Sequence, residues 1–164
     1  PMPRVSFICA LPVGTESQQE TLDLQLTESA DTVYLRQCIN RQLPQGLEVT
    51  AVKEIPPGMK KARLRETHFR ITLNGAELKA EDLKKFLESE YFPILKVTKK
   101  GEHSIDAKSL VKAISVIASD KIEIALGYTE GPQLKPEEII NGIFPSENTG
   151  CRIVRILKIK QELE

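Results

Sequence analysis

The residues that could do chemistry in this chain are scattered acids and bases, and no nucleophile stands with a base beside it. Two acids are of interest. Glu20 follows a turn between two predicted strands, where a carboxylate is normally solvated. Asp106 lies in an otherwise extended stretch, where Asp is disfavoured. This position favours either an edge or turn residue or a carboxylate that holds a basic partner.

The basic candidates form two groups. Segment 58–66 is poor in apolar residues and is rich in Lys and Arg. In the last predicted strand, alternation places Arg155 on the same face as Ile153 and Leu157. An arginine in an apolar row needs a carboxylate or an anionic ligand. The sequence therefore predicts either a structural ion pair or an anion site at Arg155.

Most catalytic templates are missing from the sequence. Its two histidines, His68 and His103, are expected to be solvated. There is no phosphate-binding loop, dinucleotide fingerprint or nucleophile elbow. The three cysteines have neither the spacing of a metal or redox pair nor that of an iron–sulfur site. We therefore expect no catalytic site, metal or cofactor in this segment.

The composition is that of a globular protein, with 40% apolar and 28% charged residues. The 23 basic and 23 acidic residues cancel, so there is no overall positive excess for binding nucleic acid. With 5% aromatic residues, a row of rings for stacking RNA bases is not expected either. No apolar run is long enough to span a membrane and no signal peptide is visible, so we expect a cytoplasmic protein without membrane contact.

The elements that must position these residues predict an α+β fold. Residues 1–57 read as β-β-α-β, with an interior strand from Arg4, an alternating strand at 21–27, a helix at 31–43 and a strand at 47–51. Residues 58–66 read as a basic linker. Residues 67–164 read as a second α+β unit with the element order of a ferredoxin-like fold, in which 104–117 is mostly extended.

The beginning of the chain resembles a known family. The motifs are Pro3-Arg4-Val5-Ser6-Phe7, residues 10–14, and Leu22-Asp23-Leu24, with shorter similarities at 43–47, 54–56, 105–106, 134–138 and 153–155. They resemble the radical SAM-linked protein family, a bacterial domain of unknown function. That domain is found fused to cobalamin-binding radical SAM proteins or encoded beside them. The resemblance implies partnership with a radical SAM protein, and it carries over no catalytic role.

The resemblance also bears on the first unit. Family members have a further strand and helix upstream, so we expect this chain to be a fragment. Its fold would then be two ferredoxin-like α/β-sandwich units, the first without its initial strand and helix. Loss of an inner strand leaves an open sheet edge. This predicts that the N-terminal strands pair irregularly, or with a second copy of the chain in a homodimer.

The expected function is that of a non-catalytic accessory domain of a radical SAM protein, binding substrate or docking the catalytic part. The alternative is an RNA-binding module acting in RNA modification or processing, through the basic segment and the paired α+β units. A stand-alone hydrolase is disfavoured, because no nucleophile–base pair is visible. The candidate ligand or partner contacts are Arg4, Glu20, Asp106, Arg155, Lys60, Lys61 and Arg63.

Overall fold

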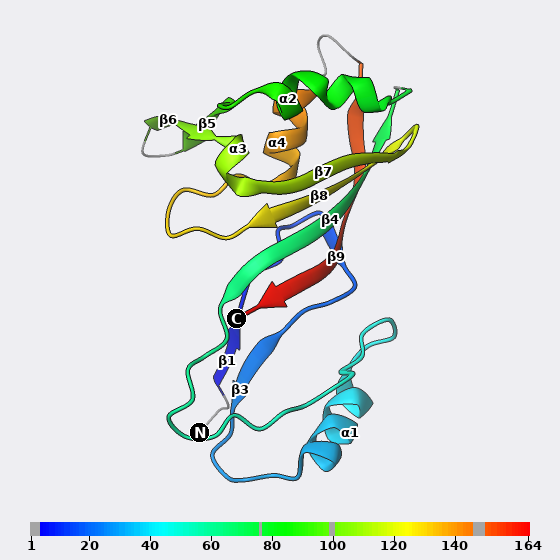
Figure 1. Cartoon of the computed structure of the whole chain (residues 1–164). Coiled ribbons are helices and arrows are strands. Elements are labelled where there is room, and N and C mark those ends of the chain that lie inside the picture. Colours follow the sequence, from blue (N-terminus) through cyan, green and yellow to red (C-terminus); the bar gives the residue numbers. More distant parts are fainter. Residues whose placement is uncertain (1–3, 76, 99–100, 146–149) are drawn as a thin grey trace. The chain divides into compact units, whose positions relative to one another are not determined.

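The longest strands of the computed structural model pair into one five-stranded sheet (Figure 1). The structure describes residues 4–75, 77–98, 101–145 and 150–164. Its first compact unit comprises Leu22–Ala62 with the residues up to Phe7, and its second comprises Ile8–Thr21 with Arg63–Glu164. This division differs from the predicted one, because the segment 8–21 contributes a strand to the sheet of the second unit. The mixture of helices and strands is α+β, as predicted.

The centre of the sheet is formed by β4 (Leu64–Asn74) and β8 (Lys121–Gly127), which are antiparallel. The side chains of β4 alternate between buried and half-buried, because successive residues of a strand point to opposite faces. β7 (Val111–Ala118) pairs with β8, and β9 (Arg152–Leu163) pairs with β4. The strand order is β2-β9-β4-β8-β7.

Helices cover one face of this sheet (Figure 1). They are the 3-10 turn η1 (Ala80–Leu83), α2 (Lys84–Glu88), α3 (Ala107–Leu110) and α4 (Pro136–Ile143). Between α2 and α3 the chain forms a hairpin of β5 (Pro93–Thr98) and β6 (Gly101–Asp106). Leaving that hairpin, η1 and α3 aside, the order β4-α2-β7-β8-α4-β9 is the β-α-β-β-α-β order on which the ferredoxin-like prediction rested.

The core lies between the sheet and these helices. Ile71 and Ile122 from the central strands are fully buried with Phe86, Ile139 and Ile140 from the helices. Helix α4 begins with Pro136 in its first turn, where a proline is well tolerated. Each of these side chains removes a large apolar surface from water, which stabilises the unit by about 1.5–3 kcal/mol per residue.

The stretch 104–117 is mostly extended, as predicted, and is interrupted at 107–110. The chain turns at Asp106 into the short helix α3, and Asp106 Oδ1 accepts hydrogen bonds from the backbone N–H groups of Phe92 (2.9 Å) and Lys108 (3.0 Å). The carboxylate thus satisfies backbone donors at a helix start, which an Asp at an N-cap does well. This geometry fits the turn alternative for Asp106.

The fifth strand, β2 (Thr15–Ser17), runs parallel to β9 at one edge of the sheet. Two ion pairs fasten it there. Arg155 binds Glu16, and Lys158 binds Glu20, which lies just after the strand. The backbone N–H of Gln18 also donates to the carbonyl of Lys158 at 2.9 Å. The segment is therefore attached by both backbone and side chains.

The first unit contains a two-stranded antiparallel sheet of β1 (Arg4–Phe7) and β3 (Leu22–Gln25), followed by α1 (Thr32–Gln42). Asp31 caps α1, which agrees with the helix predicted at 31–43. The strands pair in an unbroken register over four residue pairs and not irregularly, whereas pairing with a second copy of the chain stays a prediction.

The strand predicted at residues 47–51 is also absent from the described elements. There the backbone N–H and carbonyl of Val49 bond to the side-chain amide of Asn40, at 2.7 and 3.0 Å. A side-chain amide presents one donor and one acceptor. It therefore takes the place that a neighbouring strand would have.

The two-stranded sheet has one apolar face. Val5 lies opposite Leu24 and Phe7 opposite Leu22, and all four side chains share that face. Val5 is 53% exposed and Phe7 60% exposed, so β1 is not the interior strand that the sequence suggested. No described residue of this unit is buried. An isolated two-stranded hairpin is marginally stable at best, so packing must come from elsewhere.

Candidate functional site

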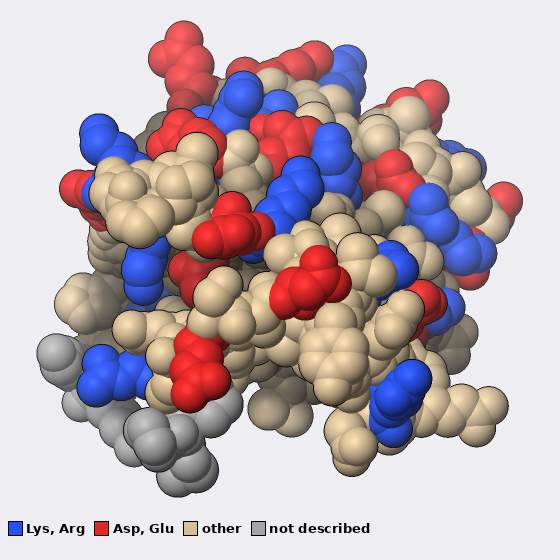
Figure 2. All heavy atoms as spheres, turned by 90° about the horizontal axis from the view of Figure 1, so that it is seen from below, with Lys and Arg blue, Asp and Glu red and all other residues tan. Residues whose placement is uncertain are grey.

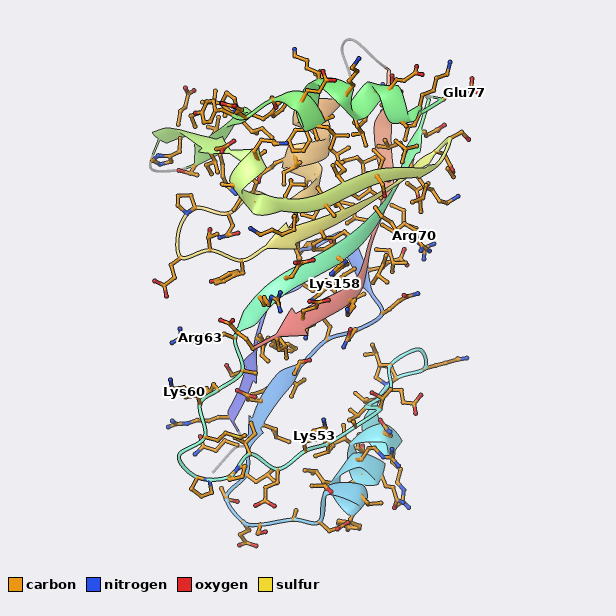
Figure 3. All side chains as sticks on the ribbon, in the orientation of Figure 1. Lys53, Lys60, Arg63, Arg70, Glu77 and Lys158 are labelled. Atoms are coloured by element: carbon orange, nitrogen blue, oxygen red, sulfur yellow. The ribbon has the colours of Figure 1, made fainter. Side chains whose placement is uncertain are left out.

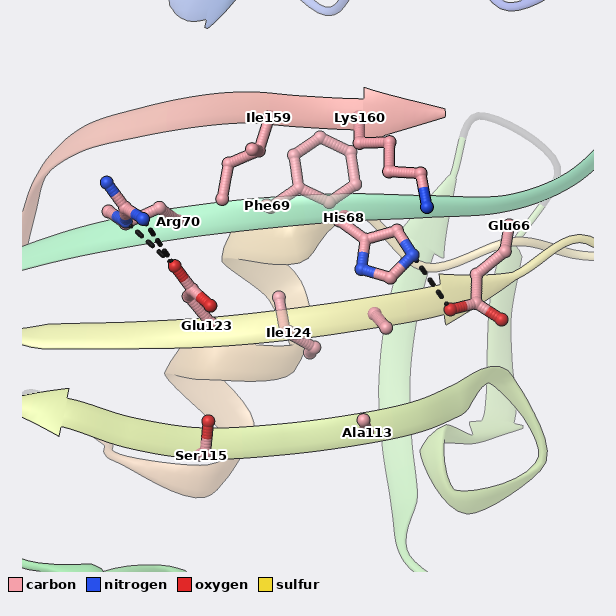
Figure 4. Close-up of a pocket in the computed structure, with 11 residues that line it drawn as sticks. Glu66, His68, Phe69, Arg70, Ala113, Ser115, Glu123, Ile124, Ile159 and Lys160 are labelled. Atoms are coloured by element: carbon pink, nitrogen blue, oxygen red, sulfur yellow. Dashed lines mark hydrogen bonds and ion pairs between the residues drawn. The ribbon is translucent and has the colours of Figure 1, made fainter. Parts of the chain in front are cut away.

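The helix-free face of the five-stranded sheet contains a hollow of about 420 Å³ (Figure 4). It exists because small side chains meet on neighbouring strands. Ala125 of β8 lies opposite Ala113 of β7, and Ser115 is the next β7 residue on that face. Larger side chains of β4, β8 and β9 surround these small ones. We call this site the sheet hollow; its small floor residues are Ala113, Ser115 and Ala125.

One end of the sheet hollow is closed by an ion pair between neighbouring strands. Arg70 donates through Nε (2.9 Å) and Nη2 (2.6 Å) to the same oxygen, Oε1, of Glu123. The two residues are register partners in β4 and β8, which sets this contact. Oε2 of Glu123 takes no part in the pair. Both side chains are more than a third exposed, so a ligand could reach them.

The other end is built around His68 (Figure 4). Its Nε2 lies 3.0 Å from Glu66 Oε1 and 3.6 Å from Glu162 Oε1. These are ion-pair distances for a protonated ring. Nε2 is nevertheless buried without an aligned hydrogen bond to any described residue. Lys160 completes this end and pairs with Glu162 at 2.5 Å. That hydrogen bond and the positive charge of Lys160 hold the pKa of Glu162 below its ordinary value.

The charges around the sheet hollow are balanced. The side chains at both ends carry both signs of charge and are already paired with one another. Within the described residues, no group of three or more metal-binding side chains comes together. The sheet hollow also satisfies the size expected of a small-molecule site, about 300–1,000 Å³.

Arg155 lies near one edge of the sheet and binds Glu16 in β2. Its Nε and Nη2 donate to the two carboxylate oxygens at 3.0 and 2.6 Å. This is the ion-pair alternative for Arg155. The hydrogen bond from Arg155 also lowers the pKa of Glu16 below its ordinary value. Arg155 and Asp106 have different partners, so the structure does not bring these two candidates together in one pocket.

Glu20 has a role that the sequence did not predict. Both of its carboxylate oxygens lie within 3.0 Å of Lys158 Nζ, and the Lys158 side chain is only 2% exposed. Lys158 is labelled in Figure 3. Lys158 also donates to Gln161 Oε1 at 2.9 Å. A lysine between Leu157 and Ile159 in an apolar strand was the available sign of a buried cation.

The remaining candidates are exposed. Arg4 pairs with Gln25 through the backbone register of β1 and β3. Lys60 and Arg63 lie along the segment before β4 (Figure 3), and Lys61 lies between them. Arg63 exchanges two backbone hydrogen bonds with Glu164. None of these four residues lines the sheet hollow.

The sheet hollow itself was missed from the sequence. His68 points away from the core, as Glu66 and Arg70 do, but it is only 33% exposed and its Nε2 is buried, so the expectation of a solvated histidine is wrong. The floor, however, is made of alanine and serine, which draw no attention in a sequence. These small residues form a floor only because β7 and β8 pair in this register, and no local sequence pattern predicts that register.

Comparison with protein families gives one match. The model of a family described as an uncharacterized protein conserved in bacteria (DUF2344) matches residues 1–136. The chain belongs to this family. The DUF2344 match includes the β4, β7 and β8 residues of the sheet hollow and stops at the first residue of α4. No curated protein and no solved structure matches the chain.

Two further observations bear on partners. Lys and Arg side chains are interspersed with Asp and Glu over the face shown in Figure 2, in keeping with the zero net charge. In the part of the chain that the structure describes, no helix combines the length and the apolar character required to cross a bilayer.

Proposed function

We propose that this DUF2344 chain is a non-catalytic accessory domain of a radical SAM protein. In this proposal the first unit docks onto the catalytic part, and the sheet hollow of the second unit binds a small molecule for it. The radical SAM connection rests on the resemblance of the N-terminal motifs, since DUF2344 membership by itself names no activity. The docking role rests on the structure of the first unit.

The observation that carries the docking role is the apolar face of the β1–β3 sheet. Val5, Phe7 and Leu22 are 53%, 60% and 45% exposed and stand side by side on one face. Grouped large apolar side chains on a surface mark an interaction site more often than isolated ones do. Covering this face would also provide the packing that the first unit lacks.

The test is a binding measurement between the chain and a cobalamin-binding radical SAM protein that is fused to or encoded beside a DUF2344 domain. We expect a complex by isothermal titration calorimetry, and we expect Phe7→Ser to weaken it about tenfold or more. Val97→Ser is the matched control, because Val97 is 71% exposed in the second unit. Absence of a complex, or turnover of a substrate by the isolated chain, would contradict the proposal.

RNA binding is the second candidate, and the basic segment before β4 favours it. Lys60, Lys61 and Arg63 are exposed, and no described carboxylate forms an ion pair with them. The open sheet face lacks the row of Phe, Tyr or Trp rings on which an RRM-type sheet stacks successive RNA bases, because its central strands present His68, Arg70 and Glu123. Any RNA contact would therefore be made to phosphates.

Filter binding across a salt series tests this candidate. Three phosphate contacts predict that log K falls with log salt at a slope of about −2. Reversing the charges, as in K60E/K61E, should flatten that slope. No binding at low salt, or a response independent of salt, would remove RNA as a partner.

A further inference from the structure

We propose that the sheet hollow binds a flat nitrogen heterocycle of nucleobase size, without net charge and with both N–H donors and acceptors. The proposal deepens the accessory role by naming the class of molecule that the second unit would take. It is argued from three features of the hollow: its floor, its two ends and its balance of charge.

The floor fits a flat ring. Ala113 and Ala125 are direct register partners on adjacent strands, so their methyl groups lie side by side. A planar ring laid on them would bury one apolar face. Ser115 follows on the same face and offers a hydroxyl at the edge of the ring, as either donor or acceptor.

The ends limit the length of the ligand. Arg70–Glu123 closes one end and His68–Glu66 the other. Glu66 and Arg70 are four residues apart in β4, a distance of about 13 Å along a strand. That length accommodates one ring system. A polymer would have to displace both pairs.

The charges favour a neutral ligand. Around the hollow, the carboxylates of Glu66, Glu123 and Glu162 face the cations Arg70 and Lys160, with His68 between them. An anionic ligand would be repelled by three carboxylates. A cationic ligand would have to compete with Arg70 and Lys160 for the carboxylates that they already bind. A neutral N–H donor could use Glu123 Oε2, which the pair with Arg70 leaves open.

The experiment titrates adenine and cytosine, as probes, into the full 164-residue chain and follows backbone amide shifts by NMR. We expect saturable shifts at the amides of Ala113, Ser115, Glu123 and Ala125 with at least one base. Ala113→Leu should weaken that binding about tenfold or more, because the added side chain fills the floor. Ala118→Leu, another exposed alanine of β7 outside the hollow, should leave the affinity within about twofold.

The proposal is overturned if neither base gives saturable shifts, if Ala113→Leu binds as well as the native chain, or if inorganic phosphate saturates the same amides with equal affinity. Ser115→Leu provides a second floor variant if Ala113→Leu loses its native spectrum. Docking onto the radical SAM protein is measured separately with Phe7→Ser. The failure of one proposal can therefore be told from the failure of the other.

Discussion

At the scale of residues, the segment that carries β2 is held to β9 by two ion pairs that differ in burial. Glu16 and Arg155 are both more than half exposed, whereas the Lys158 side chain is 2% exposed and Glu20 is 27% exposed. Exposed pairs contribute little to stability, because water solvates either partner when the other is removed. A buried ammonium has no such alternative.

We therefore expect Glu20→Gln to destabilise the second unit by roughly 3 kcal/mol, since removing one partner of a buried pair costs about 3–5 kcal/mol. Glu16→Gln is the matched control in the same segment and should have a much smaller effect. Urea denaturation of both variants measures the difference. Equal midpoints for the two variants would show that Lys158 finds another partner or water.

The Glu16 carboxyl is expected to make the stability of the fold depend on pH. Its pKa is lowered in the folded state by the hydrogen bond from Arg155. A group with a lowered folded pKa stabilises the fold above its unfolded pKa, about 4.3 for Glu, and that contribution is lost as pH falls through the folded pKa. NMR titration should find the pKa of Glu16 below its ordinary value in the native chain. In Arg155→Met, the pKa of Glu16 should return close to that ordinary value. An unchanged Glu16 pKa in that variant would contradict this cause.

At the scale of elements, local signals predicted some structures well. The helix predicted at 31–43 is α1, and the alternating strand predicted at 21–27 contains β3. In β9, alternation correctly placed Arg155 on the face of Leu157 but not on that of Ile153. Register shifts in its pairing with β4, one between Thr72 and Leu73, put Arg155 and Ile153 on different faces. A bulge inserts one residue and reverses the faces beyond it, and the pairing strand decides its place.

The hydrogen bonds between Asn40 and Val49 hold residues 47–51 against helix α1. Asn40→Ala removes two hydrogen bonds to the Val49 backbone, each worth about 1 kcal/mol. Hydrogen exchange of the Val49 amide should become faster by at least tenfold. Gln37→Ala, an exposed change on the same helix, should leave it unaltered. If both variants exchange alike, the segment is held by something other than Asn40.

At the scale of the whole molecule, the two units differ in how they are stabilised. The buried apolar residues of the described chain all lie in the second unit. A unit without a core opens locally at little cost in free energy. We expect amides of β1, β3 and α1 to exchange far faster than those of β4 and β8 in native-state hydrogen exchange.

The comparison variant for this prediction is Ile122→Ala. Ile122 is fully buried, so its truncation should cost about 2–5 kcal/mol and accelerate exchange throughout β4 and β8. Exchange in α1 should change little by comparison. Equal protection in both units of the native chain would show that they unfold as one cooperative body.

The chain passes between the two units in a way that affects how they can be inherited. The connection between β1 and β3 supplies the edge strand β2 of the other unit, so the polypeptide passes from one unit to the other three times. A single cut after residue 62 would separate β2 covalently from the sheet it completes. A gene fusion, duplication or deletion that carried one unit alone would leave the other without a strand. Evolution is therefore expected to have moved these units together, as a single inherited module.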